Sequence, residues 1–204
     1  MAKQLREPEE ALYPAPVVLV TCIDEKGRSN IITLAWVGII CSEPPMIGIS
    51  IRPSRYSNSL IKESKEFVVN IPTVDLLRKV DYCGTVSGKT VDKFKEAGFT
   101  PESAAKVRSS LIKECPVNIE CKLKQQLTLG VHDLFLGEVV AIHTTEEILN
   151  EEGKIDYAKA KPLVFNQGEY WNLGKKLENY GFSQGRIKEI PFKSELIGED
   201  QVVA

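Results

Sequence analysis

Short runs rich in β-branched and aromatic residues, separated by turn residues, recur between residues 17 and 143. The runs VVLVTCI at 17–23 and NIITLAWV at 30–37 flank the turn signal DEKG, which predicts a β-hairpin. Similar patterns predict further strands at residues 46–51, 67–71, 117–129 and 134–143. Short helices are predicted at residues 57–64, 75–83 and 90–97. About six strands with short helical insertions indicate a mainly β barrel rather than a βαβ fold.

Three boundaries in this prediction depend on single residues. Ser57 is expected to cap the first helix, and Gly98 to end the last one. His132 and Asp133 are expected to form the turn between the two long strands. After Gly181 the chain becomes polar and weakly patterned, so we expect one domain over residues 1–182 and a C-terminal arm or tail over residues 183–204.

Composition and charge exclude several classes of function. The chain has 204 residues, 26% of them charged, with a formal net charge of -2, so electrostatics gives no reason to expect nucleic-acid binding. The first ten residues are charged and do not resemble a secretory signal. The longest apolar run, residues 31–41, is shorter than the roughly 20 residues of a membrane-spanning helix. We therefore expect a cytoplasmic protein without a membrane partner.

The cysteines and histidines do not predict a metal site. The five cysteines form no CxxC pair, and reduced, mostly buried thiols are expected in a cytoplasmic chain. The histidines, His132 and His143, lie far from any cysteine pair. Cys41 and Cys83 have two interpretations, as packed thiols or as neighbours of a bound ligand.

The segment GTVSGKT at residues 84–90 is similar to a P-loop but does not match it. A P-loop places four residues between its first glycine and its Gly-Lys pair, whereas Gly84 and Gly88 enclose three. The preceding residues also have a helical pattern, and a P-loop follows a strand. Two interpretations remain: a flexible surface loop, or glycines and amides at the edge of a different anion site.

Hydrogen-bond donors are crowded where the strand at 46–51 ends, in the segment ISIRPSRYSN. Such crowding indicates either a solvated turn with a helix cap or an anion-binding site. The strand at 30–37 has a similar ambiguity. Either Trp36 is a core anchor and Asn30 a turn residue, or Asn30, Thr33 and the exposed backbone form part of a ligand wall.

Taken together, several blocks resemble the flavin reductase-like family, most closely its flavoredoxin branch. The resemblance extends from about Tyr13 to about Gly181, and its blocks occur in the family's order: YPAPVVLVTCIDEKGRSNIITLAW, PPMIGISIRPSRYSNSLI, FVVNIP, SGKTVDKFKEAGFT and FLGEVVAIH. It implies an FMN-binding split β-barrel of Greek-key-like topology, a homodimer with FMN near the subunit interface.

The resemblance also implies a set of cofactor-binding residues. Arg52, Arg55 and Ser57 would hold the flavin phosphate, with Lys93 reaching toward it, because guanidinium and ammonium groups suit a phosphate. The block from Asn30 to Trp36 would border the flavin ring. The full implied set is Asn30, Thr33, Leu34, Ala35, Trp36, Ser50, Ile51, Arg52, Arg55, Ser57 and Lys93.

Some roles have a structural alternative. Arg55 is either a phosphate ligand or a solvated arginine, and Ser50 and Ser54 either border the site or satisfy local backbone. His132 either contacts a nicotinamide or is a structural turn residue. Tyr170 and Trp171 either cover the flavin or pack in the dimer.

The implied function is electron transfer through bound FMN, with two alternatives. The first is a reductase that accepts electrons from NADH or NADPH and passes them to free flavin, ferric iron or a protein partner. The second is a flavoredoxin-type carrier that a redox protein partner reduces, without an NAD(P)H site of its own. No general acid or base is required for either, because the cofactor supplies the chemistry.

Overall fold

The computed structural model describes residues 2–183, and contacts divide the chain into two units, Met1–Leu173 and Gly174–Ala204. All helices and strands of the described residues lie in the first unit. In the second unit, residues 174–183 contain no helix or strand. The predicted tail, residues 183–204, lies outside the described residues apart from Ser183.

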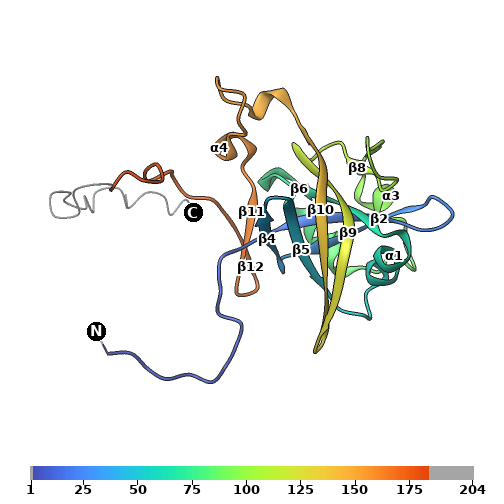
Figure 1. The fold of residues 1–204 in the computed structure, drawn as a ribbon, viewed down its shortest axis with the longest axis horizontal. Helices are drawn as coiled ribbons and strands as arrows, with labels where there is room; N and C mark the ends of the chain where they lie inside the picture. Colours follow the sequence, from blue (N-terminus) through green and yellow to red (C-terminus); the bar gives the residue numbers. More distant parts are fainter. Residues whose placement is uncertain (1, 184–204) are drawn as a thin grey trace. The chain divides into compact units, whose positions relative to one another are not determined.

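A seven-stranded antiparallel sheet forms the body of the first unit (Figure 1). In spatial order its strands are β3 (Ser29–Leu34), β2 (Val18–Ile23), β6 (Glu66–Ile71), β9 (Val117–Leu129), β10 (His132–Thr144), β5 (Pro45–Ile51) and β4 (Val37–Ser42). The edge strands are therefore β3 and β4, which follow each other in the chain. The predicted mainly β class is confirmed.

Smaller elements surround this sheet. Two further sheets consist of β1 (Ala15–Pro16), β11 (Leu163–Asn166) and β12 (Glu169–Asn172), and of β7 (Pro101–Glu102) and β8 (Leu111–Ile112). The helices are α1 (Tyr56–Ser64), α2 (Leu77–Thr85), α3 (Lys93–Ala97) and α4 (Tyr157–Ala160), with 3-10 turns η1 (Val74–Leu76) and η2 (Glu146–Ile148). Among residues 2–183, no helix has the length and apolar character needed to cross a membrane.

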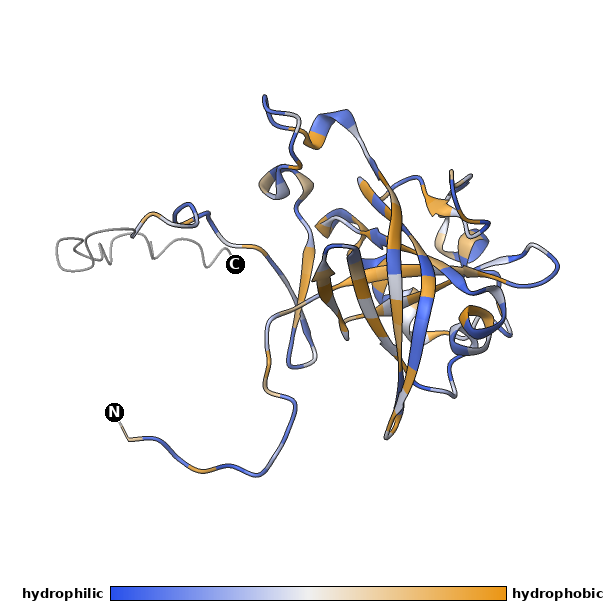
Figure 2. Cartoon of the chain, in the orientation of Figure 1, coloured by the Kyte–Doolittle hydropathy of each residue, from blue (hydrophilic) through white to orange (hydrophobic). Residues whose placement is uncertain are grey.

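Strand β2 is buried on both faces, which explains its continuous apolar sequence. Val18 and Val20 point into one core cluster, together with Phe67 and Phe135. Leu19 points into the other, which α2 and α3 cover. Because side chains alternate along a strand, β2 connects two cores that lie on opposite faces of the sheet. Figure 2 shows the hydrophobic residues concentrated along these central strands.

Two predicted strand boundaries are wrong. The strand predicted over residues 30–37 is interrupted, because the chain bends at Ala35 and Trp36 before β4 begins at Val37. His132 and Asp133 are not turn residues, because they form the first pairs of β10 with β9. Gly130, with a φ of 52°, is at the tight turn instead. The long hairpin therefore places His132 on a strand.

Two predicted helix starts are also wrong. Helix α1 begins at Tyr56, with Arg55 at the N-cap position and no side-chain cap. The Ser57 hydroxyl instead accepts a hydrogen bond from Nδ2 of Asn30 at 2.8 Å. Helix α3 begins at Lys93, capped by Asp92, and ends at Gly98 as predicted. The serine that was expected to cap a helix therefore joins α1 to β3.

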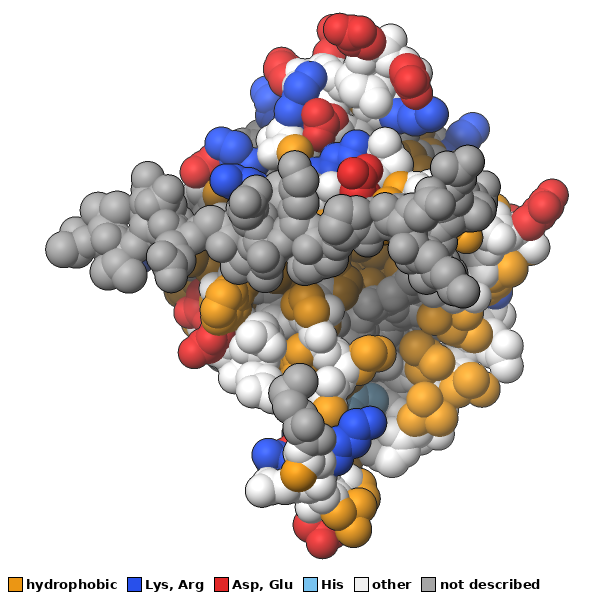
Figure 3. Space-filling view, turned by 90° about the vertical axis from the view of Figure 1, so that its left-hand side faces the viewer, with side chains coloured by type: hydrophobic (Ala, Val, Ile, Leu, Met, Phe, Trp, Pro, Cys, Tyr) orange, Lys and Arg blue, Asp and Glu red, His pale blue; other side chains and the backbone are white. Residues whose placement is uncertain are grey.

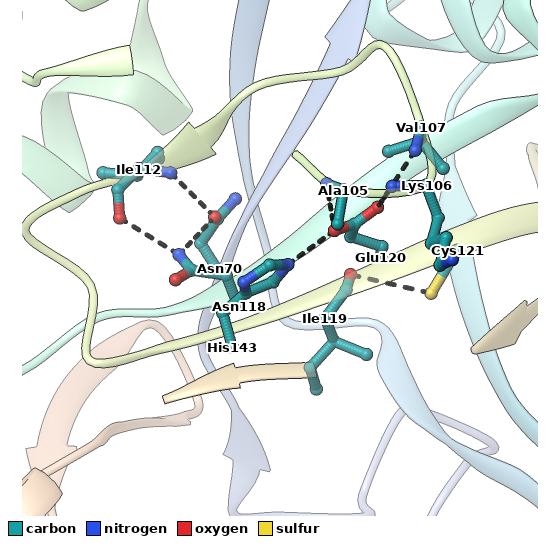
Figure 4. Close-up of polar contacts among 10 residues, drawn as sticks. All are labelled: Asn70, Ala105, Lys106, Val107, Ile112, Asn118, Ile119, Glu120, Cys121 and His143. Atoms are coloured by element: carbon teal, nitrogen blue, oxygen red, sulfur yellow. Dashed lines mark hydrogen bonds and ion pairs between the residues drawn. The ribbon is translucent and has the colours of Figure 1, made fainter. Parts of the chain in front are cut away.

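A buried carboxylate anchors the segment that precedes β8 (Figure 4). Glu120 on β9 accepts hydrogen bonds from the amides of Ala105, Lys106 and Val107 at 2.6–3.0 Å, and it also contacts Nε2 of His143. Burial of Glu120 opposes its ionisation, but these donors outweigh that effect and lower the pKa of its carboxyl group. The chain before β8 is thus fixed against the sheet.

Candidate functional site

Trp36 lies at the bend between β3 and β4, where it forms one wall of a groove. Its carbonyl accepts a hydrogen bond from the Ser50 amide at 2.9 Å, which fixes the bend against β5. Its ring lies parallel to that of His132, with centroids 6.5 Å apart, and it also contacts Phe165 at 6.0 Å. The Trp36 side chain remains 42% exposed. It is therefore not a core anchor but a flat aromatic surface open to a ligand.

The end of β5 is held rigidly beside this wall. Asn58 on α1 donates to the Ile51 carbonyl at 3.1 Å and to Asp133 on β10 at 2.9 Å. Asp133 also accepts from Lys62 and from Thr128, at 2.8 Å each. The hydrogen bond from Lys62, followed by those from Asn58 and Thr128, lowers the pKa of Asp133 well below its usual range. Helix α1 therefore has a fixed position relative to the end of β5, which Arg52 follows.

Below this strand end is a cavity of about 310 Å³ that is rich in hydrogen-bond donors. Arg52 and Arg55 line it, and a backbone bond from the Arg55 amide to the Arg52 carbonyl, 3.0 Å long, closes the turn between them. Within residues 2–183, several amides of the lining have no acceptor, among them those of Ser54, Tyr56, Ser57, Ser87 and Gly88. Such amides beside two guanidinium groups make the cavity suited to a phosphate or another anion.

Lys93 lies at the base of the same cavity. It is only 4% exposed, and its Nζ donates to the carbonyls of Ile31 and Cys83 at 2.7 and 2.6 Å. Burial, and to a smaller extent the charge of Arg55, lowers its pKa, although the nearby Cys83 and Cys22 oppose that shift. An ammonium group has three donors, so one remains for a ligand. Lys93 connects β3 to the end of α2 and adds positive charge beneath the cavity.

Asn30 and Gly88 close the cavity at one end. A Cβ added at Gly88 would lie 1.8 Å from Oδ1 of Asn30, so only glycine allows the loop after α2 to pass this close. The same Asn30 side chain donates to Ser57. The contacts of Asn30 therefore bring the loop over residues 86–90 and the start of α1 to the same place on β3.

Two smaller cavities continue this one along β3 toward Trp36. The first, of about 120 Å³, shares Ile32, Arg52, Arg55 and Gly84 with the donor-rich cavity and adds His132. The second, of about 220 Å³, shares Thr33, Leu34 and Trp36 with the first and ends at Phe165 and Tyr170. We call the three together the groove. All predicted site residues line it: Asn30, Thr33, Leu34, Ala35, Trp36, Ser50, Ile51, Arg52, Arg55, Ser57, Lys93 and His132.

The groove also contains residues outside the implied cofactor-binding set, and two of them, Gly84 and Tyr170, had a site role only as one of two alternatives in the sequence. Gly84, at the end of α2, faces Thr33, where an added Cβ would be 3.2 Å from the threonine Cβ. Phe165 and Asp81 border the far end, where the Tyr170 hydroxyl donates to Asp81 at 3.2 Å. Burial and the neighbouring Asp81 charge raise the pKa of Tyr170 to about 12. In the sequence, the glycines of the GTVSGKT segment indicated a role for the end of α2 and the loop after it.

The thiols and carboxylates do not indicate a nucleophile or a metal centre. Burial raises the pKa of Cys22 and Cys83 to about 11, so both remain protonated near neutral pH. In the part of the chain that the structure describes, no three His, Cys, Asp or Glu side chains are grouped to hold a metal ion. The groove thus combines a donor-rich end with an apolar and aromatic end.

Comparison with known proteins assigns the chain to a family. Residues 11–174 match the family model described as flavin reductase like domain. The chain belongs to this family. An uncharacterized protein of Archaeoglobus fulgidus is 39% identical over 171 residues, which is 83% of this chain and 94% of that protein.

Solved structures support the same family and the fold. The flavoredoxin of Desulfovibrio vulgaris (Miyazaki F) is 36% identical, with a TM-score of 0.84 over 91% of this chain and all of that one. A flavoredoxin from Methanosarcina acetivorans is 31% identical, with a TM-score of 0.82 over 90% of this chain and 98% of that one. The resemblance to flavoredoxins and the split-barrel fold predicted from the sequence are therefore confirmed.

Proposed function

We propose that this protein binds FMN in the groove and transfers electrons through it. The observation that supports this most is the junction of an anion-suited cavity with an aromatic wall in one groove. FMN has the matching shape, because a doubly charged phosphate is joined by a short chain to a flat, neutral ring system. The family to which the chain belongs consists of flavin reductase-like proteins.

The residues of the groove divide into two groups in this proposal. Arg52, Arg55 and the unpaired amides of the 54–57 and 87–88 segments hold the phosphate, because charge-assisted hydrogen bonds are the strongest available there. Trp36, Ile32 and Leu34 form the apolar wall for the ring, while the backbone at residues 33–37 faces its polar edge. Lys93 raises the positive potential at the phosphate end without leaving its carbonyl partners.

When bound, the flavin supplies the redox chemistry, and the protein supplies binding, orientation and exclusion of water. As a reductase, the protein would accept electrons from NADH or NADPH and deliver them to free flavin, ferric iron or a protein. His132 suits a nicotinamide contact, because its ring lies beside Trp36 at the apolar part of the groove.

A second candidate is a flavoredoxin-type electron carrier without a site for NADH or NADPH. The similarity to two flavoredoxins, at 36% and 31% identity, favours this alternative. As a carrier, the protein would receive electrons from a reduced protein partner instead. Both candidates use the same groove and the same flavin, and they differ only in the electron donor.

We further propose that the protein is a homodimer. Strand β4 lies at the edge of the sheet, with Ile39 86% and Ile40 53% exposed. Leu127, Leu129 and Val131 are exposed at the end of the β9–β10 hairpin. Figure 3 views the molecule from the side on which β4 lies in Figure 1 and shows hydrophobic side chains gathered there. An unpaired edge with exposed apolar residues favours pairing with a second copy.

The absorbance spectrum of the purified protein tests FMN binding, and anaerobic reduction then distinguishes the two candidates. A yellow protein, or a colourless one that takes up FMN, supports the proposal. Bleaching within seconds of adding NADH or NADPH supports the reductase, and bleaching only with a reduced protein donor supports the carrier. A protein that neither contains nor takes up FMN contradicts both.

A further inference from the structure

The first residues of the described chain form an exposed segment, which we call the N-terminal arm (residues 2–12). The arm contains no helix or strand, and all of its side chains are exposed. Leu5 is 103% exposed and Leu12 is 94% exposed. In an extended chain, at about 3.3 Å per residue, these two leucines lie about 23 Å apart. Their spacing suits a segment that lies across a surface rather than one with a core of its own.

The N-terminal arm is anchored beside the edge of the large sheet. Directly after the arm, Tyr13 contacts Phe165 with ring centroids 6.2 Å apart, and Phe165 in turn contacts Trp36. Strand β1, which follows, pairs with β11 and also contacts β4. The arm therefore leaves the first unit next to β4, the edge strand at which we propose that a second copy pairs.

Apolar side chains also cross the outer face of the sheet from that edge. On β10, Phe135 points into the core, so its neighbour Leu134 lies on the opposite face. Cross-strand partners share a face, and Leu134 is paired with Leu127 on β9. Ile40 of β4 reaches the same place, because a Cβ added at Gly48 would meet the side chains of both Ile40 and Leu134. We define the outer stripe by its five apolar members on β4, β9 and β10: Ile40, Leu127, Leu129, Leu134 and Leu136.

The outer stripe is not covered within one copy. Ile40 is 53%, Leu127 39% and Leu129 52% exposed, and among the described residues none of the five members belongs to a core cluster. Neighbouring strands are about 4.8 Å apart, so β4, β5, β10 and β9 together span about 14 Å, less than the distance of about 23 Å between Leu5 and Leu12. The arm is thus long enough to lie across such a stripe, yet its leucines and the stripe of the same copy both stay exposed.

We propose that the N-terminal arm of one copy lies across the outer stripe of a second copy, and that the second arm does the same in return. A two-fold axis makes such a contact reciprocal, because the same pair of surfaces meets twice. The inference rests on the proposed homodimer, since the arm leaves the first unit at the edge where the second copy would pair. It adds to that dimer an exchanged segment whose leucines cover exposed apolar side chains of the other copy.

Cysteine cross-linking tests whether the arm reaches a second copy. All variants carry Cys41→Ser, because Cys41 is the one native cysteine that is not buried. Full-length chains with Leu5→Cys are mixed with full-length chains that carry Leu127→Cys, and the mixture is oxidised mildly. A non-reducing gel should show a cross-linked dimer of the two chains. Leu77→Cys, at an exposed leucine on α2 outside the outer stripe, replaces Leu127→Cys in the control and should cross-link much more slowly.

Sedimentation of an arm variant tests whether the leucines contribute to the dimer. Leu5→Ser combined with Leu12→Ser should raise the dissociation constant of the dimer at least about 10-fold, because each of two arms loses two apolar contacts. Both leucines are exposed in one copy, so the variant should keep the fold. Lys3→Ser combined with Glu10→Ser, which changes two exposed polar residues of the same arm, is the matched control and should leave the dissociation constant unchanged.

The outcomes separate this inference from the proposed dimer, and the inference requires both expected results. If the wild type is a dimer but the leucine variant dimerises as tightly, or the mixed chains cross-link no faster than the control, the inference is overturned and the dimer stands. A chain that carries both Leu5→Cys and Leu127→Cys and oxidises to a cross-linked monomer would place the arm on its own stripe and also overturn it. If the wild type is a monomer that binds FMN, the dimer and the inference both fail, and the flavin site stands.

Discussion

At the scale of single residues, the groove depends on the point at the end of β5 where side chains change from buried to exposed. Ile51 is 1% exposed and points into the core of the sheet, so the next residue, Arg52, points out of it. Arg52 lines both the donor-rich cavity and the one beside Trp36. One guanidinium group is thus placed between the proposed phosphate and the proposed ring.

Replacing Arg52 by alanine should weaken FMN binding about 10- to 100-fold, because a charge-assisted hydrogen bond is worth about 1.5–3 kcal/mol. Riboflavin has no phosphate, so its affinity should hardly change. Titration of the wild type and the variant with both flavins measures the contrast. An equal loss for FMN and riboflavin would show that Arg52 supports the ring or the fold. No loss for either would leave the phosphate to the amides, Ser57 and Lys93.

Replacing Gly88 by alanine should damage both the cavity and the fold. The new Cβ would overlap Oδ1 of Asn30, and relief of such overpacking typically costs about 1–3 kcal/mol. Denaturant unfolding should show this loss, and FMN affinity should fall as the loop moves. Gly38→Ala is the control, because an added Cβ meets nothing within 4 Å there. If the double variant Gly88→Ala with Asn30→Ala is no better than Gly88→Ala alone, the proposed clash is not the cause.

At the scale of elements, α1 and the β9–β10 hairpin are joined by the carboxylate of Asp133. It is 1% exposed and accepts hydrogen bonds from residues on α1 and on β9. Because Asn58 also holds the end of β5, this one carboxylate connects three of the elements that surround the groove.

Asp133→Asn should lower the free energy of unfolding by about 1.5–3 kcal/mol at neutral pH, because hydrogen bonds to an ionised group are lost. The folded pKa of Asp133 lies below its ordinary value of about 3.9, so this stabilisation is present above that pH and is lost as the pH falls below it. Denaturant unfolding between pH 7 and pH 2 measures both. Asp75→Asn, at an exposed residue, is the control. A variant that matches the wild type at pH 7 would contradict the connecting role.

At the scale of the whole molecule, the exposed edge strand leads to the dimer prediction. Sedimentation at micromolar concentration should show a dimer for the wild type and a shift toward monomer for Ile39→Lys. Ile39 is 86% exposed, so the charge should not disturb the monomer fold. Leu77→Lys, at an exposed leucine on α2, should leave the dimer intact. A wild type that sediments only as a monomer with FMN bound would contradict the prediction.

The pattern of apolar and turn residues in the sequence predicted the parts of the fold that depend on interactions between residues close in the chain. The strand over residues 117–129 was predicted with the bounds of β9, because its alternation is long and regular. The break at Trp36 was missed, because a hydrogen bond from Ser50, distant in the sequence, fixes it. Ser57 was assigned to a helix cap, because its actual partner, Asn30, lies on β3 and is distant in the sequence. The residues of the groove were predicted from the resemblance to a family. The backbone amides of Ser87 and Gly88 could not be predicted, because a backbone group has no side chain that would mark it in the sequence.

The distribution of the groove over the chain links ligand binding to the stability of the whole first unit. Most of its walls come from residues 30–36, 50–57 and 84–93 and from His132, which meet only when β3, β5, α2 and the long hairpin are all in place. A partly unfolded chain therefore has no such cavity to offer. A ligand that binds only the complete fold adds about 2.7 kcal/mol when present at 100 times its dissociation constant. Occupancy of the groove thus protects both cores against unfolding, including strands that never touch the ligand.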